Sequence, residues 1–260
     1  MSEVHVWDMG LLCRFFYAPG GEQYGADRFV RAVQTAMDVR DPDHVFIAAD
    51  VHGVPTWRHK LYPAYKAHRP DRPPEVDEAL KAQHGRVLAL LPDSVIVLSV
   101  PGYEADDLVA TVALESTEAG FDCAVFSGDK DMAQLLTNPD VCLFNGNVDV
   151  EVSREGITRK FGVEPKQIVD YLAIAGDTCD GVPGVRGIGP KGAAAILEVH
   201  KNLQAAIEAA WLLCESGGAG SLDRKLKAGT DQALLCHKLV SLDASVPVPI
   251  RWPWLPKVQT

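Results

Sequence analysis

Short apolar runs and longer amphipathic segments alternate along roughly the first 150 residues of the chain. The apolar runs have the length and composition of buried strands, and they predict strands at residues 4–7, 44–50, 94–100, 123–128 and 141–144. The segments between them carry apolar residues at helical spacing, which predicts helices at residues 26–39, 75–91 and 104–120. Paired prolines suit the start of the second helix, and Gly120 ends the third.

This alternation indicates an α/β fold with a mostly parallel central sheet and helices on both faces, because nearly all-apolar strands are typical of sheets that are buried on both sides. From about Ser153 onward the pattern becomes helical, and this serine suits a helix cap. We therefore predict two domains. The division is an α/β domain at residues 1–160 with an inserted segment at about 52–83, and a helical region at residues 161–260 with a helix-hairpin-helix at about 165–200 and further C-terminal helices.

Nine acidic residues lie where acids are hard to explain as ordinary surface. They follow predicted strands, start a helical pattern, or lie in a turn or at a helix end: Asp8, Asp50, Glu104, Asp106, Asp107, Asp129, Asp131, Asp177 and Asp180. Ligands of parallel sheets bind beyond the carboxyl ends of the strands, where several of these acids are expected. Carboxylates gathered there repel one another unless hard cations are bound between them.

The acids divide into two candidate metal groups. Two Mg²⁺ or Mn²⁺ ions about 4 Å apart can activate a water and stabilise the leaving oxygen of a phosphodiester. The first group would comprise Asp8, Asp50, Glu104, Asp106 and Asp107, with Glu104 and Asp107 as outer members, and the second would comprise Asp129, Asp131, Asp177 and Asp180. The three-residue spacing of the last two places both on one face of a helix end. The pattern predicts a two-metal phosphodiesterase.

A simpler interpretation exists for each acid alone. Any one of them could be a helix cap or a solvated side chain, and the acids that open the helix at residue 104 could only complement its dipole. The recurrence of all the groups in one chain favours the metal site.

A glycine-rich turn follows the last two acids. The sequence GVPGVRGIGPKGA predicts a helix-hairpin-helix whose next helix starts at Pro190. Glycines let the backbone approach a phosphate closely, and the helix N-terminus adds its dipole. Such contacts bind DNA without reading its sequence. We expect Gly184, Gly187, Gly189 and Lys191 to bind DNA, whereas the alternative is a bare turn between two helices.

A basic and aromatic stretch, WRHKLYPAYKAHRP, lies in the inserted segment. Interleaved aromatics and cations suit stacking on bases and pairing with phosphates of a single strand, and the alternative is a solvated loop. We expect DNA contacts from Arg58, Lys60, Lys66 and Arg69. Near a metal pair, the last two could also stabilise charge on the reacting phosphate.

Composition and charge narrow the classes of partner. Hydrophobic residues make up 47% of the chain, no apolar run approaches the roughly 20 residues that span a bilayer, and no signal peptide is visible at the N-terminus. The six cysteines are scattered, which favours reduced thiols and a cytoplasmic location. The net charge of −10 at first argues against a nucleic-acid partner. The nine clustered acids account for most of this charge, so the rest of the chain is compatible with binding nucleic acid.

With these motifs in place, the chain resembles the 5′-nuclease, or flap endonuclease, superfamily. It looks most like the 5′-nuclease domain of bacterial DNA polymerase I and its stand-alone bacterial and phage relatives. The resemblance rests on Asp8, Asp50, YKAHRP, GYEADDLVATVA, SGDKDMAQLL and GDTCDGVPGVRGIGPKGA. It implies a PIN-like nuclease sheet, a helical arch formed by the inserted segment at about residues 52–83, and a helix-three-turn-helix DNA clamp. The first motif departs from the family pattern, because DMGLLCRFFYA stands where DG and small polar residues are common.

The resemblance also implies roles for individual residues. The nine acids match the two metal groups of the family, Lys66 and Arg69 match arch residues that contact the reacting phosphate, and Tyr65 matches the arch tyrosine. The implied products are 5′-phosphate and 3′-hydroxyl ends. A K⁺ ion in the hairpin is a further expectation.

The leading hypothesis is thus a monomeric, structure-selective 5′→3′ exonuclease and flap endonuclease of replication or repair. Its substrates would be DNA with a 5′ end, flap, nick or gap, with RNA–DNA hybrids as a further class. A DNA polymerase would act in trans, near the nucleoid or other replicating DNA, and no membrane partner is expected. The alternatives are a non-catalytic flap-binding module and a PIN-like ribonuclease.

Overall fold

The computed structural model describes residues 1–260 except 1, 19–20, 146–149, 249 and 251–260. Contacts within the chain define two compact units. The first comprises residues 1–56, 70–152 and 242–260, and the second comprises residues 57–69 and 153–241. The inserted segment thus contributes residues 57–69 to the helical unit, and the chain returns to the sheet unit after residue 241.

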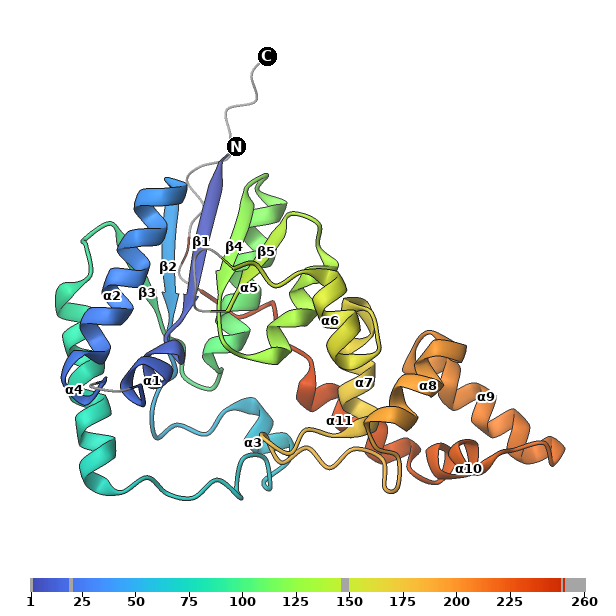
Figure 1. The fold of residues 1–260 in the computed structure, drawn as a ribbon. Helices are drawn as coiled ribbons and strands as arrows, with labels where there is room; N and C mark the ends of the chain where they lie inside the picture. Colours follow the sequence, from blue (N-terminus) through green and yellow to red (C-terminus); the bar gives the residue numbers. More distant parts are fainter. Residues whose placement is uncertain (1, 19–20, 146–149, 249, 251–260) are drawn as a thin grey trace, which may run out of the picture. The chain divides into compact units, whose positions relative to one another are not determined.

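The first unit is built on a five-stranded parallel sheet (Figure 1). Its order is β3-β2-β1-β4-β5, and the strands are β1 (Glu3–Asp8), β2 (His44–Ala48), β3 (Val95–Leu98), β4 (Asp122–Phe126) and β5 (Val141–Phe144). The predicted strands and their parallel arrangement are confirmed. Because all strands run the same way, their carboxyl ends share one edge of the sheet.

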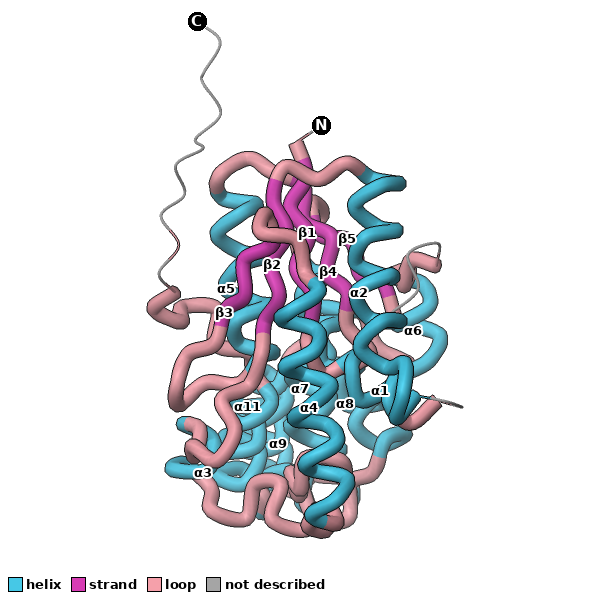
Figure 2. Tube along the Cα trace, turned by 90° about the vertical axis from the view of Figure 1, so that its left-hand side faces the viewer, coloured by secondary structure: helices cyan, strands magenta, loops and turns pink. Residues whose placement is uncertain are grey.

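Helices cover both faces of this sheet. Figure 2 shows α2 (Gly21–Arg40) and α4 (Pro74–Leu90) on one face and α5 (Ala105–Glu118) on the other. The core under α2 contains Trp7, which stacks on Phe126 with ring centroids 4.0 Å apart and meets Phe29 edge-on. The unit is completed by α1 (Leu11–Phe16) and by η1 (Lys130–Thr137), which is a 3₁₀ helix.

The second unit is helical, as predicted. It comprises α3 (Trp57–Leu61), α6 (Arg154–Phe161), η2 (Pro165–Gln167), α7 (Ile168–Ala175), α8 (Pro190–His200), α9 (Leu203–Ser216), α10 (Ser221–Ala228) and α11 (Thr230–Val240). Ser153 caps α6 as expected, because its Oγ accepts the N–H of Gly156 at 3.0 Å. Gly162 ends that helix in a left-handed conformation.

The segment predicted as an arch is less helical than expected. Only the five residues of α3 form a helix before α4, and residues 62–69 form turns that fold onto the loop after α7. Prolines at positions 63, 70, 73 and 74 account for this, because proline cannot donate to a helix interior and disfavours helix at the preceding residue.

None of the helices among the described residues is long and apolar enough to cross a membrane.

Candidate metal and phosphate sites

Asp8 lies at the carboxyl end of β1 and is only 7% exposed. Its carboxylate accepts the N–H of Gly10 at 2.7 Å and the hydroxyl of Ser127 at 2.8 Å. Burial raises the pKa of this carboxyl to about 6, against the two hydrogen bonds and with help from the nearby negative charges of Asp50 and Asp129. Like charges held this close in a poorly solvated place favour a bound cation.

Ser127 connects Asp8 to the next acidic motif. While its hydroxyl donates to Asp8, its oxygen accepts the N–H of Asp129 at 3.0 Å. Asp129 in turn caps η1, because its Oδ1 accepts the N–H of Asp131 at 2.8 Å. Ser127 is not among the site residues predicted from the sequence, although a polar residue between a buried strand and Asp129 is a signal for one.

A pocket of about 490 Å³ opens at this edge of the sheet. It is lined by Asp8, Asp129, Arg14, Asn145 and backbone of the glycines that follow β1 and β4. Arg14 donates to the backbone and side-chain oxygens of Asn145 at 2.9 and 2.8 Å. Although the motif DMGLLCRFFYA departs from the family pattern, its Arg14 still lines the same pocket as Asp8 and Asp129.

Asp50 and Glu104 meet at the start of α5. The Oδ1 of Asp50 accepts the N–H of Ala105 at 2.7 Å, while Glu104 is the N-cap residue of the same helix and is 7% exposed. Asp106 lies in the first turn, half-buried. Both interpretations of these acids therefore apply, because they complement the helix dipole and also place carboxylates at the edge that Asp8 occupies.

Asp107 differs from the other acids of the first group. It is fully buried, and its two oxygens accept the N–H groups of Glu104 at 3.2 Å and Asp243 at 2.9 Å. These bonds complete the cap of α5 and hold the returning C-terminal segment against it. The structure therefore favours a structural role for Asp107 over that of a metal ligand.

The second predicted group takes Asp129 and Asp131 from the first unit and Asp177 and Asp180 from the second. The last two do not share a helix face, because α7 ends at Ala175 and they lie in the turn beyond it. Asp177 is 5% exposed, pairs with Val182 through both backbone bonds, and accepts the N–H of Cys179 at 3.0 Å.

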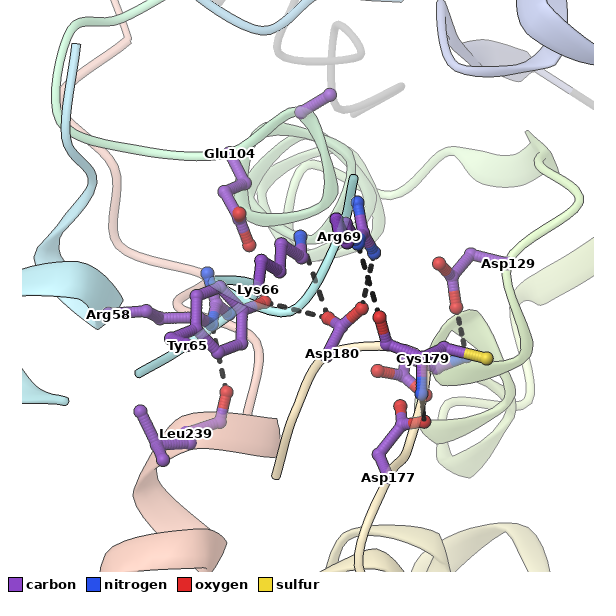
Figure 3. A network of polar contacts seen from close by, with 12 residues as sticks. Arg58, Tyr65, Lys66, Arg69, Glu104, Asp129, Asp177, Cys179, Asp180 and Leu239 are labelled. Carbon is purple, nitrogen blue, oxygen red and sulfur yellow. Dashed lines mark hydrogen bonds and ion pairs between the residues drawn. The ribbon is translucent and has the colours of Figure 1, made fainter. Parts of the chain in front are cut away.

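Asp180 lies at the centre of a polar network with the arch residues (Figure 3). It accepts the hydroxyl of Tyr65 at 2.7 Å and an Nη of Arg69 at 2.6 Å, and its Oδ2 lies 3.5 Å from the Nζ of Lys66. Arg69 also donates to the carbonyl of Cys179 at 3.1 Å. A predicted metal ligand is thus paired with two predicted phosphate-binding cations.

Backbone geometry strengthens this contact. The N–H of Lys66 donates to the carbonyl of Asp180 at 2.8 Å, with Lys66 in the left-handed region at φ 56°. Such a conformation is costly for a non-glycine residue and persists only where its surroundings hold it. Gly181 has the complementary shape, since a Cβ there would lie 2.9 Å from the ring of His68.

Two predictions for the arch need correction. Arg58 is 2% exposed, stacks on Trp57, and donates to the carbonyls of Leu239 and Ser241 at 2.9 Å each, so it closes the C-terminal end of α11 instead of contacting DNA. Tyr65 is also 2% exposed, so its ring is not a platform on which a base can stack in this structure. Lys60 is exposed, and its contact with DNA stays a prediction.

The glycine hairpin has the geometry that the sequence predicts. Gly184 and Gly187 have φ values of 65° and 80°, and a Cβ on Gly184 would lie 2.4 Å from the backbone nitrogen of Gly176. Gly189 is the N-cap residue of α8, with open space where a Cβ would be, and the helix starts at Pro190 as expected. Lys191 is exposed in its first turn.

The parallel sheet with its acidic edge, followed by a hairpin-bearing helical unit, defines a PIN-like nuclease. Residues 8–162 match the family of 5′-3′ exonuclease N-terminal resolvase-like domains, and residues 163–258 match the 5′-3′ exonuclease C-terminal SAM fold. The chain belongs to the 5′-3′ exonuclease family.

Individual relatives agree with this assignment. The chain is 33% identical over 223 residues to the flap endonuclease Xni of Shewanella piezotolerans, which covers 85% of this chain and 83% of that protein. It is 36% identical over 177 residues to a 5′-3′ exonuclease of Aquifex aeolicus, covering 68% and 59% of the two chains. It is 32% identical over 237 residues to DNA polymerase I of Synechocystis, covering 86% of this chain but only 23% of that protein.

Solved structures show the same fold. The 5′-exonuclease of bacteriophage T5 with bound zinc superimposes with a TM-score of 0.77 at 22% identity, over 93% of this chain and 90% of that one. The T5 D15 flap endonuclease in a pseudo-enzyme-product complex with DNA and metal ions gives 0.78 at 21% identity, over 93% and 89% of the two chains.

Proposed function

We propose that this protein is a structure-selective 5′→3′ exonuclease and flap endonuclease that hydrolyses DNA phosphodiesters to 5′-phosphate and 3′-hydroxyl ends. The observation that carries the proposal is the hydrogen-bonded series Asp8, Ser127, Asp129 and Asp131 at the carboxyl edge of a PIN-like sheet. Asp50, Asp8 and Asp129 follow the neighbouring strands β2, β1 and β4. Helix capping and burial alone do not explain an acid after each of these three strands.

The donor set fits two divalent cations. Every candidate ligand is a carboxylate, and hard oxygen donors suit Mg²⁺ or Mn²⁺ better than softer metals. We propose that Asp8, Asp50, Glu104 and Asp106 hold one ion and that Asp129, Asp131, Asp177 and Asp180 hold the other. When bound, the ions would activate a water and stabilise the leaving oxygen.

The remaining residues would act on the substrate. Lys66 and Arg69 pair with Asp180 in this structure. As the reacting strand binds, its phosphate would replace Asp180 as the anion that these two cations contact. Tyr65 would keep Asp180 oriented through its hydroxyl. The hairpin would hold the duplex through backbone N–H groups and the N-terminus of α8, with Lys191 beside it.

The partners follow from this activity. We propose DNA with a 5′ end, flap, nick or gap as the substrate, RNA–DNA hybrids as a second substrate, and a DNA polymerase that acts in trans. The protein would work as a monomer in the cytoplasm beside replicating DNA. The K⁺ ion in the hairpin stays a prediction.

A titration of Mg²⁺ and Mn²⁺ against labelled flap, nicked and gapped DNA tests the proposal, with single-stranded RNA in parallel. We expect metal-dependent cleavage near the flap junction. Binding of flaps without cleavage at any metal concentration would instead identify a flap-binding module, and preferred cleavage of the RNA would identify a ribonuclease.

A further inference from the structure

The hairpin is attached on one side to the helix that precedes it. The N–H of Val185 donates to the carbonyl of Ile174 at 2.8 Å, and the N–H of Ile188 donates back to Val185 at 3.0 Å. Val185 and Ile188 are buried, at 2% and 4% exposed. These contacts fix the inner part of the hairpin, whereas Gly187 at its tip is exposed.

A lysine from a distant helix holds this tip. The Nζ of Lys225, in α10, donates to the carbonyl of Gly187 at 2.9 Å. A Cβ on residue 187 would lie 3.3 Å from Cε and 3.5 Å from Nζ of this lysine, so the glycine leaves room for the lysine chain as well as for its own φ of 80°. The contact joins positions 38 residues apart, so no local pattern in the sequence indicates it.

Close approaches on either side of Lys225 place α10 beside the hairpin and the helix that follows it. Gly229 follows α10, and a Cβ there would lie 2.8 Å from Cγ1 of Val185. At the other end, Leu222 lies 3.4 Å from the position of a Cβ on Gly192. Lys225 lies between these two positions along the helix.

The next lysine of the same helix offers a comparison. Lys227 directs its Nζ over the ring of Trp211, 4.2 Å from the ring centroid, and so faces α9 instead of the hairpin. The two residues carry the same charge on the same two-turn helix. Only Lys225 bonds the hairpin backbone.

We propose that Lys225 is a positioning residue that holds the tip of the hairpin in its DNA-binding conformation. A charge-assisted bond to the Gly187 carbonyl restrains the hairpin backbone that would approach a phosphate, and the ammonium group retains two further donors beside it. The inference rests on the proposed function, because it assumes that the hairpin binds duplex DNA.

The test compares Lys225→Met with Lys227→Met, which remove one charge each, and with Lys225→Arg. Affinity for a 5′-flap duplex is measured in EDTA, which prevents hydrolysis, and hydrogen exchange of the Ile188 amide is measured in the free protein. We expect Lys225→Met to weaken binding about tenfold, to speed exchange at Ile188, and to raise KM for cleavage with kcat within about twofold. Lys227→Met should change binding less than about twofold, and Lys225→Arg should keep most of the affinity.

Equal losses in the two methionine variants would overturn the inference, because the effect would then be that of net charge. Unchanged binding or unchanged exchange in Lys225→Met would also overturn it. If the wild-type protein bound no duplex, the proposed function would fail together with the inference. A wild-type protein that binds and cleaves flaps while Lys225→Met behaves identically would contradict only the inference.

Discussion

The hydroxyl of Tyr65 donates to the carboxylate of Asp180 across 115 positions of the sequence, at 2.7 Å. Arg69 and Lys66 lie on the same carboxylate, so one aspartate collects the phenol and both cations of the segment (Figure 3). Residues implicated in binding the ion and the phosphate are therefore joined before either is bound. In the second unit, the contacts that order residues 65–69 are therefore the same contacts that orient the candidate metal ligand Asp180.

Tyr65→Phe tests that relationship. Removing a hydroxyl that donates to a mostly buried carboxylate is expected to lower the free energy of unfolding by about 1–2 kcal/mol, as measured by urea denaturation at pH 7. Tyr62→Phe is the matched control in the same segment, because the Tyr62 hydroxyl makes no hydrogen bond to any residue that the structure describes, and it should change stability by less than about 0.5 kcal/mol. Equal effects of the two substitutions would contradict the account.

Arg58→Met tests the corrected role of Arg58. It leaves the carbonyls of Leu239 and Ser241 without their buried donor, and we expect a loss of about 3 kcal/mol in unfolding free energy. Lys60→Met, two residues away and exposed, should be nearly neutral for stability but should weaken DNA binding. The reverse pattern, with a stable Arg58→Met protein that binds DNA poorly, would restore the original prediction for Arg58.

Ser127→Ala tests the link between the two acidic motifs. Because Ser127 bonds both Asp8 and the backbone of Asp129, its loss should raise the Mg²⁺ concentration for half-maximal cleavage about tenfold or more, with a smaller change at saturating Mg²⁺. Ser127→Thr keeps the hydroxyl and should restore most of the metal affinity. An unchanged metal dependence in Ser127→Ala would show that the serine only packs.

Stability at low pH should depend on Glu3, far from the acidic edge. Burial opposes ionisation, but hydrogen bonds from His5 and Arg40 outweigh it and lower the pKa of Glu3 from 4.5 to about 2. A depressed pKa stabilises the folded state above pH 4.5, and this contribution is lost as the pH falls toward 2.

The Glu3→Gln variant should therefore be less stable than the wild type at pH 7, by on the order of 2 kcal/mol. The difference should shrink steadily below pH 4.5, as followed by urea denaturation between pH 7 and pH 3. A difference that stays constant over this range would exclude titration of Glu3 as its cause.

Most of the sheet unit could be predicted from the sequence because its signals are local. Each buried strand is a short apolar run, and parallel strands bring Asp8, Asp50 and Asp129 to one edge whatever the details of the helices. The hairpin could be predicted as well, since Gly184 and Gly187 have backbone conformations that other residues rarely adopt.

The parts that sequence could not predict depend on partners far along the chain. Arg58 has the composition of a DNA contact, and only its bonds to residues more than 180 positions away show that it is internal. Asp107 belongs to an acidic motif, yet Asp243 gives it a structural bond. The same holds for Lys225, whose pairing with Gly187 follows from the packing of α10.

The central claim is that the acids at the sheet edge bind divalent ions for phosphodiester hydrolysis. Its most direct test is Mg²⁺-dependent cleavage of a 5′-flap duplex by the double variant Asp129→Asn with Asp131→Asn, in which the asparagine oxygen can still cap η1. Thermal unfolding in EDTA should match the wild type, and the stabilisation by Mg²⁺ should be lost. We predict that cleavage falls at least about a thousandfold; cleavage within about twofold of the wild type would contradict the metal assignment.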